Sequence, residues 1–111
     1  MEVYQKSKKL AVELHDLSMK YPKFELWELG SQLRRAALSI PLNIAESKQF
    51  YEGNEKKQLN VAYGSAGETI AILDIIYDLK YINKEQCDRF TNELQQIQKI
   101  LYVIIKRIKA C

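Results

Sequence analysis

The amino-acid sequence predicts an all-α protein, in which one domain over residues 1–111 forms an antiparallel up-down-up-down four-helix bundle. Four segments carry apolar residues at the alternating three- and four-residue steps of an amphipathic helix. The connections between them are short, which is typical of antiparallel neighbours in a bundle. The sequence contains no Asn-Gly or Asp-Gly turn and no alternating apolar pattern from which a sheet could be built.

The composition indicates a soluble, folded chain. Hydrophobic residues make up 47% of the 111 positions, 28% are charged, and only four glycines and two prolines occur, which argues against disordered and collagen-like classes. The longest apolar run is Ile100–Ile105, well short of the roughly 18 residues that a membrane span needs. Because MEVYQKSKK at the N-terminus lacks the apolar core of a secretion signal, we expect a cytoplasmic protein without membrane contact.

The first helix is predicted to end at Pro22, because proline cannot continue a helix. Its apolar side is a heptad pattern interrupted once by serine, and it consists of Val3, Ser7, Leu10, Leu14, Leu17 and Tyr21. A connector follows from Tyr21 to Gly30. It contains the apolar residues Phe24, Leu26, Trp27 and Leu29. A solvated loop would not carry so many apolar side chains, so we expect the connector to pack over one end of the core.

The second helix is predicted over Leu33–Ser47 and ends near Lys48. Its core-facing positions are Leu33, Ala37, Ile40 and Ile44. Pro41 lies inside this helix, where it removes one backbone donor and leaves the carbonyl of Ala37 without its usual partner. Such a proline costs about 3 kcal/mol unless another donor or a kink compensates.

Polar residues follow the second helix on a side away from its core-facing positions. This polar stripe consists of Gln32, Arg35, Ser39, Asn43 and Glu46. We expect Ser39 and Asn43 to compensate for Pro41, and the stripe to contact a neighbouring helix or subunit. The alternative is a ligand-binding groove.

The third helix is predicted from Asn54, as an N-cap that follows a glycine and precedes a glutamate, to about Tyr81. Near its middle, the sequence AYGSAGE at residues 62–68 contains small residues that let a neighbouring backbone come close. Gly64 and Gly67 each cost about 1 kcal/mol of helix stability relative to alanine. We therefore expect close packing at these two glycines to offset that cost.

The fourth helix is predicted to open with a capping box made by Asn83 and Gln86. Its heptad pattern is uninterrupted and runs through Cys87, Phe90, Leu94, Ile97, Leu101, Ile104, Ile108 and Cys111. On one helix Cys87 and Cys111 lie about 36 Å apart, at about 1.5 Å per residue, which is too far for a disulfide. We expect both to be reduced thiols in the core.

The helices carry more apolar surface than a bundle core needs. ILYVII at residues 100–105 is apolar on every side, and residues 69–79 contain only three polar side chains. In the second helix, Leu38 and Leu42 point away from the core-facing positions. Exposed patches of this kind usually mark protein contacts, so we expect self-association. The alternative is a large core that the connector partly covers.

Several short motifs occur together along the chain. They comprise Pro22 with Glu25, then Gln32, Arg35, Ala36, Ser39, Ile40 and Asn43-Ile44-Ala45-Glu46, then Ala62, Gly64-Ser65 and Glu68. With this combination the chain resembles the bacterial 23S rRNA-intervening-sequence protein family over nearly its whole length. It departs from the family at Ser47, where glycine is usual, and at Ala66 and Thr69, where larger apolar residues are usual.

The resemblance implies a left-handed four-helix bundle that assembles as a five-fold ring, and it supplies no enzymatic activity or cofactor. Family members are encoded inside intervening sequences of 23S rRNA genes and elsewhere in bacterial genomes. The accessory protein of diversity-generating retroelements, which binds nucleic acid and a reverse transcriptase, is similar. By analogy, the function of this chain lies in binding.

Charge is distributed unevenly along the sequence. Residues 61–82 hold one lysine against three acids, whereas residues 94–111 hold four basic residues and no acid. A helix dipole favours cations near a C-terminus by about 0.3 to 1 kcal/mol, which is the structural explanation. Repeated around a ring, such tails could bind phosphates together. The candidate nucleic-acid-binding residues are Arg34, Lys48, Lys106, Arg107 and Lys109.

No catalytic or metal-binding constellation is predicted. His15 is the only histidine and the two cysteines lack ligand spacing, so no zinc cluster is expected. A nucleophile at Ser39 or Cys87 would have to be aligned with His15, which the spacing does not show. Asp74 and Asp78 could pair as acid and base, but two carboxylates one turn apart are usually a solvated strip. We expect no enzymatic activity.

Two functions from different classes remain. The first is a self-assembling accessory protein, preferably a pentamer, that binds RNA or DNA phosphates without reading bases. The second is an adaptor that docks a partner enzyme such as a reverse transcriptase, with no nucleic-acid binding. The adaptor would use the apolar surface of the last two helices and the stripe from Arg35 to Glu46. Salt-sensitive binding to generic RNA separates the two.

Overall fold

The computed structural model describes residues 2–20, 26–48 and 52–108. In these ranges the chain forms four α-helices and one short π-helix. They are α1 (Glu2–Ser18), η1 (Leu26–Gly30), α3 (Ser31–Ser47), α4 (Glu52–Asp78) and α5 (Lys84–Arg107). The described ranges contain no strand, so the all-α class is confirmed. None of these helices is both long and apolar enough to cross a membrane.

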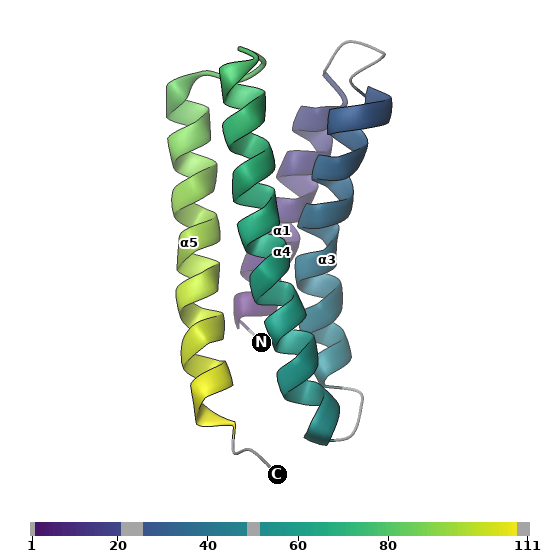
Figure 1. Cartoon of the computed structure of the whole chain (residues 1–111), viewed down its shortest axis with the longest axis vertical. Coiled ribbons are helices and arrows are strands. Elements are labelled where there is room, and N and C mark those ends of the chain that lie inside the picture. The colour runs from purple at the N-terminus through teal and green to yellow at the C-terminus, as the bar shows by residue number, and fades with distance from the viewer. Residues whose placement is uncertain (1, 21–25, 49–51, 109–111) are drawn as a thin grey trace.

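The α-helices lie side by side along the long axis of the molecule, which measures 47 Å against 24 and 19 Å in the other directions (Figure 1). α3 packs against α1 and α4, α4 also packs against α5, and α5 contacts α1. The end of α1 and the start of α3 lie at one end of the molecule, and the ends of α3 and α5 lie at the other (Figure 1). This arrangement is compatible with a four-helix bundle.

The core consists of apolar side chains from all four α-helices. The largest that are fully buried are Leu14, Leu33, Ile40, Ile44, Leu59, Leu73, Ile76, Leu94, Ile97 and Leu101. The core-facing positions predicted for α3 are all buried, and α3 ends at Ser47 with Lys48 as its C-cap, as predicted. In α1 the heptad pattern is buried from Val3 to Leu14, whereas Tyr21 lies outside the described residues.

α5 begins as the sequence predicts. The Asn83 side chain accepts from the Gln86 backbone N–H at 2.7 Å, and the Gln86 side chain accepts from the Asn83 backbone N–H at 3.0 Å. The heptad positions from Phe90 to Leu101 are buried, whereas Cys87, Ile104 and Ile108 are partly buried against the core. Cys87 carries a free thiol, and Cys111 lies outside the described residues.

An ion pair on the surface joins α5 to α1. The Arg89 guanidinium donates a hydrogen bond to the Glu13 carboxylate and lies 3.7 Å from the Glu93 carboxylate in the next turn. The hydrogen bond to Glu13 raises the pKa of Arg89 above its ordinary value. The same guanidinium lies 4.6 Å from the centre of the Phe90 ring. Because Arg89 and Glu13 are both partly exposed, we expect this pair to fix the register of the two helices more than their stability.

The third predicted helix differs from the structure at both ends. α4 begins at Glu52, so Asn54 lies inside the first turn and the predicted N-cap is wrong. No residue at position 52 or 53 excludes helical backbone angles, and the helix starts two residues earlier. At the other end α4 stops at Asp78 instead of near Tyr81, because Lys80 takes a left-handed conformation with φ of 68°.

Trp27, in the described part of the connector from Tyr21 to Gly30, does not pack over the core as predicted. Leu26–Gly30 forms η1, which leads directly into α3, and Trp27 on it is 78% exposed. The prediction is therefore wrong for Trp27, because this turn buries Gly30 and directs the indole ring outward. Phe24 lies outside the described residues.

The small residues of α4 divide between the inside and the outside of the molecule. Ser65 and Ala66 are buried, whereas a Cβ added to Gly64 would meet nothing within 4 Å. A Cβ added to Gly67 would lie 3.4 Å from the Gln98 side-chain amide, which is ordinary contact. The predicted close packing is therefore wrong for Gly64 within this chain, because Gly64 is exposed, whereas Gly67 is half-buried against Gln98 of α5.

Candidate nucleic-acid interface

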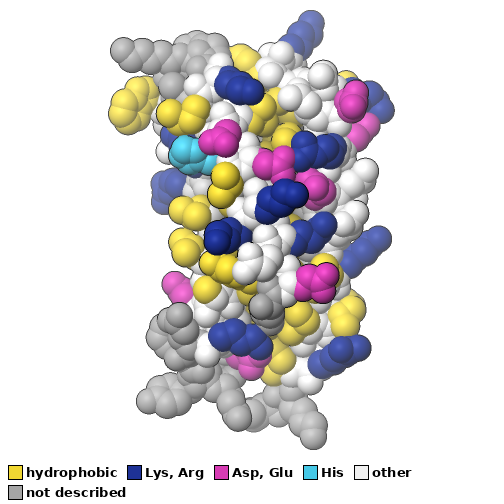
Figure 2. All heavy atoms as spheres, turned by 180° about the vertical axis from the view of Figure 1, so that it is seen from behind, with side chains coloured by type: hydrophobic (Ala, Val, Ile, Leu, Met, Phe, Trp, Pro, Cys, Tyr) yellow, Lys and Arg dark blue, Asp and Glu magenta, His cyan; other side chains and the backbone are white. Residues whose placement is uncertain are grey.

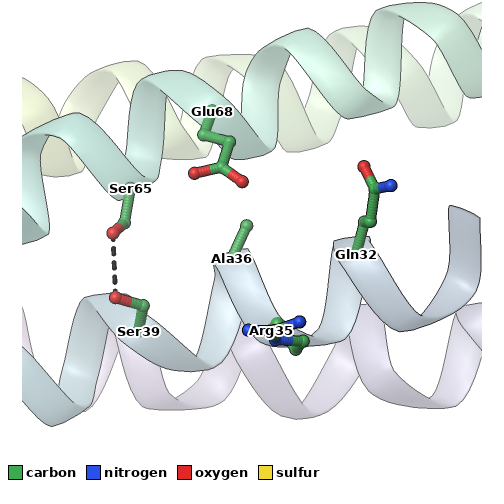
Figure 3. Close-up of a pocket in the computed structure, with 6 residues that line it drawn as sticks. All are labelled: Gln32, Arg35, Ala36, Ser39, Ser65 and Glu68. Atoms are coloured by element: carbon green, nitrogen blue, oxygen red, sulfur yellow. Dashed lines mark hydrogen bonds between the residues drawn. The ribbon is translucent and has the colours of Figure 1, made fainter.

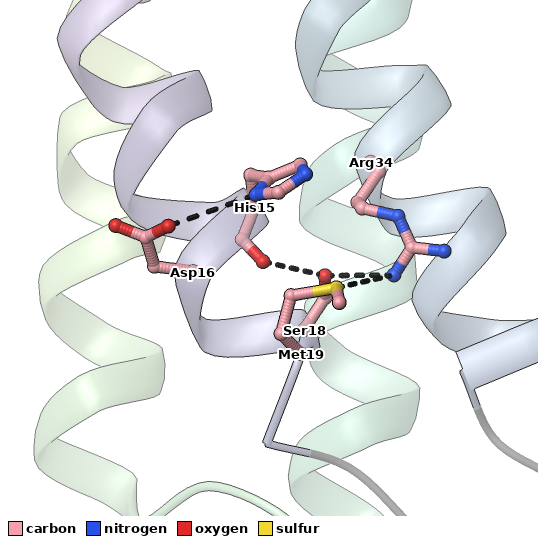
Figure 4. Close-up of polar contacts among 5 residues, drawn as sticks. All are labelled: His15, Asp16, Ser18, Met19 and Arg34. Carbon is pink, nitrogen blue, oxygen red and sulfur yellow. Dashed lines mark hydrogen bonds and ion pairs between the residues drawn. The ribbon is translucent and has the colours of Figure 1, made fainter. Parts of the chain in front are cut away.

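The structure does not bring the five predicted basic residues together. Arg34 lies near the start of α3, where its Nη1 donates to the Ser18 hydroxyl at 2.9 Å (Figure 4). Lys106 and Arg107 lie in the last turn of α5, at the opposite end of the molecule (Figure 1). Lys48 is at that same end, but its ammonium faces the Glu55 carboxylate at 3.3 Å. Lys109 lies outside the described residues.

A different set of residues surrounds Lys106. The early part of α4 faces the late part of α5 across a hollow of about 380 Å³, and a second hollow of about 660 Å³ continues along the same two helices. Tyr63 and Tyr102 line both hollows, so we treat them as one feature, the α4/α5 groove. Its polar lining consists of Lys56, Asn60, Tyr63, Gln95, Gln98, Lys99, Tyr102 and Lys106.

Helical periodicity aligns these side chains along the groove. On α4, Lys56, Asn60 and Tyr63 follow at steps of four and three residues, and on α5, Lys99, Tyr102 and Lys106 follow at steps of three and four. Residues at these spacings lie one above another on a helix face. Each of the two helices therefore contributes a row of side chains that includes lysine and tyrosine. Tyr63 of one row and Tyr102 of the other line both hollows.

The charged side chains among the described lining residues of the α4/α5 groove are all positive. It contains three ammonium groups, and no carboxylate occurs among the lining residues that the structure describes. The Lys106 ammonium lies 5.4 Å from the centre of the Tyr102 ring, within the range of a cation–π contact. The Gln98 amide donates to the Tyr63 carbonyl at 3.4 Å and joins the two walls. Such a surface attracts anions and also offers exposed aromatic faces.

Part of the polar stripe on α3 joins this helix to α4. The Ser39 and Ser65 hydroxyls lie 2.9 Å apart (Figure 3). The Asn43 amide donates to the Ser39 hydroxyl at 2.9 Å and to the Ser39 carbonyl at 2.8 Å. None of these hydrogen bonds reaches the carbonyl of Ala37, so the expected compensation for Pro41 by Ser39 and Asn43 is not seen among them. The Asn43 amide holds Ser39 within α3, and the contact between the Ser39 and Ser65 hydroxyls joins α3 to α4.

The rest of the polar stripe is exposed. Gln32 and Arg35 line a shallow pocket of about 340 Å³ between α3 and α4, into which the Glu68 carboxylate points (Figure 3). Glu46 is exposed and lies farther along the helix. Because the pocket combines a guanidinium with a carboxylate, it has no single charge preference, and the alternative of a ligand-binding groove has weak support.

A second elongated surface lies between α1 and α3. This apolar groove has a volume of about 390 Å³, and its lining consists of Tyr4, Lys8, Ala11, Val12, His15, Arg34, Leu38, Pro41 and Leu42. Val12, Leu38 and Leu42 are each more than half exposed. Figure 2 shows hydrophobic side chains gathered along one side of this face, beside the histidine. The prediction that Leu38 and Leu42 point away from the core is confirmed.

The described residues contain no group of three or more His, Cys, Asp or Glu side chains that could hold a metal ion. His15 is exposed and its Nδ1 lies 3.6 Å from the Asp16 carboxylate (Figure 4). Asp74 and Asp78 are both exposed on α4. None of these groups lines a pocket together with a serine or cysteine that could act as a nucleophile.

Most residues of the α4/α5 groove were not predicted from the sequence. Lys56, Asn60, Tyr63 and Tyr102 carry a detectable signal, because basic, amide and aromatic residues repeat at helical spacing. That signal shows which residues share a face of one helix. It does not show that the faces of α4 and α5 meet.

Comparisons with known proteins identify the same family by sequence and by fold over most of the chain. A family model described as 23S rRNA-intervening sequence protein matches residues 1–103. The fold is similar to the crystal structure of a protein with unknown function from the S23 ribosomal protein family of Bacteroides thetaiotaomicron VPI-5482. The TM-score is 0.84, with 31% sequence identity over 94% of this chain and 95% of that one. No curated protein matches the chain.

Proposed function

The chain belongs to the 23S rRNA-intervening sequence protein family, and on that premise we propose that it is a non-enzymatic, self-assembling accessory protein that binds RNA or DNA phosphates. The observation that carries this proposal is the α4/α5 groove, in which Lys56, Lys99 and Lys106 come together without a carboxylate among the described lining residues. We place its action in the cytoplasm.

The spacing of the ammonium groups suits a nucleic-acid backbone. Lys99 and Lys106 are separated by two helical turns, about 10 Å along α5. Phosphates of one strand follow each other about every 3.4 Å along a duplex axis, so a backbone in the groove would present several to the lysines. The formal net charge of +3 acts in the same direction. Arg107 extends the positive end of α5 beyond the groove.

Salt dependence tests this function. Each neutralised phosphate steepens the fall of log affinity with log salt by about 0.7 for a single strand and about 0.9 for a duplex. The three lysines of one chain would give a slope of about 2 for a single strand and about 2.7 for a duplex, and an assembly that uses several copies should exceed about 3 on either. Fluorescence anisotropy of labelled RNA and DNA between low and physiological salt measures this slope.

Matched variants locate the contact. Replacing Lys56, Lys99 and Lys106 together by glutamine should weaken binding and flatten the salt slope. The control replaces the exposed Lys9, Lys20 and Lys80 by glutamine, which changes the net charge equally but lies away from the groove. If the wild type does not bind at low salt, or if both triple variants lose the same slope, the proposed site is wrong.

The proposal includes the bundle topology and its assembly. We propose an up-down-up-down, left-handed bundle that closes into a ring, preferably a pentamer. Short connections and heptad patterns in α1 and α5 support the topology and the handedness. The exposed apolar side chains on α3, α4 and α5 support assembly, because a monomer gains nothing from leaving them in water.

Charge complementarity indicates how two copies would meet. The apolar groove between α1 and α3 is flanked by the basic residues Lys8 and Arg34. On α4, the apolar residues Ile75 and Leu79 are about half exposed and stand beside the exposed Asp74 and Asp78. We propose that this α4 strip of one copy occupies the apolar groove of the next. Such a contact joins unlike surfaces, so it repeats head to tail and can close into a ring.

The adaptor function is the second candidate. The observation that favours it is the same apolar groove between α1 and α3, which a helix of a partner enzyme such as a reverse transcriptase could fill. Absence of nucleic-acid binding by an otherwise folded wild-type protein would favour the adaptor.

A further inference from the structure

Two tyrosine rings at the centre of the α4/α5 groove go beyond what phosphate binding requires. Tyr102 is 53% exposed and Tyr63 is 38% exposed, and the rings line the junction of the two hollows. Phosphates are bound by lysine, arginine, backbone N–H groups and hydroxyls, including that of tyrosine, but they gain nothing from the face of an aromatic ring. The rings therefore need an explanation of their own.

The surroundings of the rings match the chemistry of a nucleobase. Every base has a flat π-face that stacks on an aromatic side chain, and polar edges that hydrogen-bond to amides. The Asn60 and Gln95 side chains provide such amides on either side of the tyrosines. The Lys106 ammonium lies over the Tyr102 ring, 5.4 Å from its centre, so a base that stacks on this face displaces the ammonium toward a phosphate of the same strand.

We propose that the α4/α5 groove is a binding site for single-stranded RNA or DNA, in which bases stack on Tyr63 and Tyr102 while Lys56, Lys99 and Lys106 hold the phosphates. This inference rests on the proposed nucleic-acid binding and adds a preference for single strands. The bases of a duplex are already stacked inside the helix and present no free faces to the tyrosines, so only an unpaired strand gains the stacking contacts.

The experiment compares single and double strands of the same sequence. Anisotropy of a labelled 12-nucleotide RNA and of its duplex is measured with the full-length wild-type protein. In one variant Tyr63 and Tyr102 are both replaced by leucine, which removes the rings and keeps apolar volume. In the control both are replaced by phenylalanine, which keeps the rings and removes the hydroxyls.

The wild type should bind the single strand more tightly than the duplex. The leucine variant should lose about 10-fold in single-strand affinity for each ring that stacks on a base, with little change for the duplex. The phenylalanine variant should keep the single-strand preference. Circular dichroism and light scattering confirm that the variants are folded and assembled like the wild type.

The possible failures are distinguishable. If neither strand form binds at low salt, the proposed function itself fails. If both bind with a salt-dependent affinity but the leucine variant loses nothing, or loses equally for both forms, the stacking inference is overturned and phosphate binding stands. If the leucine variant loses its assembled mass, the tyrosines form a contact between copies, which also overturns the inference.

Discussion

At the scale of single residues, short polar side chains connect α3 and α4 at the edge of the apolar core. Ser65 is buried on α4, its hydroxyl meets that of Ser39 on α3, and the Asn43 amide holds Ser39 in place. Farther along α4, the buried Thr69 hydroxyl donates to the Ser65 carbonyl at 2.7 Å. A buried polar group costs free energy unless it is hydrogen-bonded, so each member of this set depends on its partner.

Removing both partners of the serine pair should therefore cost less than the sum of the costs of removing each one alone. Ser39→Ala leaves the buried Ser65 hydroxyl without that contact and should lower the free energy of unfolding by about 1 to 2 kcal/mol. The double variant Ser39→Ala, Ser65→Ala should cost less than the sum of the single changes, with a coupling of about 1 kcal/mol. Denaturant unfolding of the four proteins at one protein concentration measures it. Additive effects would mean that the two hydroxyls do not interact.

At the scale of elements, the end of α4 is determined by an unusual residue in a common motif. The Tyr81 N–H donates to the Ile76 carbonyl at 3.2 Å and the Lys80 N–H donates to the Tyr77 carbonyl at 2.9 Å, which is the pattern of a Schellman motif. The position that Lys80 occupies usually carries glycine, because a side chain is strained at a positive φ. The motif ends α4 and allows the Asn83 capping box to start α5.

Glycine at this position should stabilise the protein. Lys80→Gly removes the strain of the left-handed conformation and should raise the free energy of unfolding by about 1 kcal/mol, which is several degrees in Tm for a domain of this size. Lys80→Ala is the matched control, because it removes the same charge and keeps a Cβ, and it should give no comparable gain. Thermal and denaturant unfolding test both. Equal stabilisation by the two changes would assign the effect to the charge.

At the scale of the whole molecule, unlike surfaces lie on different sides. The apolar groove is formed by α1 and α3, whereas the complementary strip with Ile75 and Leu79 belongs to α4. A head-to-tail contact of this kind needs both surfaces on every copy, so a change to either one should break the assembly.

Light scattering coupled to size exclusion should give the wild type several times the 13.0 kDa of one chain, with a pentamer preferred. Leu42→Asp in the groove should reduce the mass, because it places a carboxylate in an apolar contact. Changing Asp74 and Asp78 to lysine should do the same by reversing the charge of the strip. Mixing the two variants should restore a dimer, since each still carries one intact surface.

Three outcomes would contradict this arrangement. A monomeric wild type at micromolar concentration would refute self-assembly. Full assembly of the strip variant would show that Asp74 and Asp78 are not at the contact. A mixture that stays monomeric would show that the two surfaces do not bind each other.

The structural features that could be predicted from the sequence are local ones. The heptad patterns predicted which residues of α1, α3 and α5 face the core, and the pair Asn83 and Gln86 predicted the start of α5. These features depend on residues within a few turns of one another, and the spacing of a helix relates them directly. The all-α class and the family were also accessible for this reason.

The features that depend on the tertiary structure are contacts between residues that are distant in sequence. It separated Arg34 from Lys106, directed Trp27 outward, left Gly64 without a packed neighbour in this chain and brought Tyr63 next to Tyr102. The physical reason is that periodicity defines a face on each helix but not the rotation and register with which two helices pack. That choice depends on how the side chains of both helices fill the core together, and it decides which surface residues form a groove.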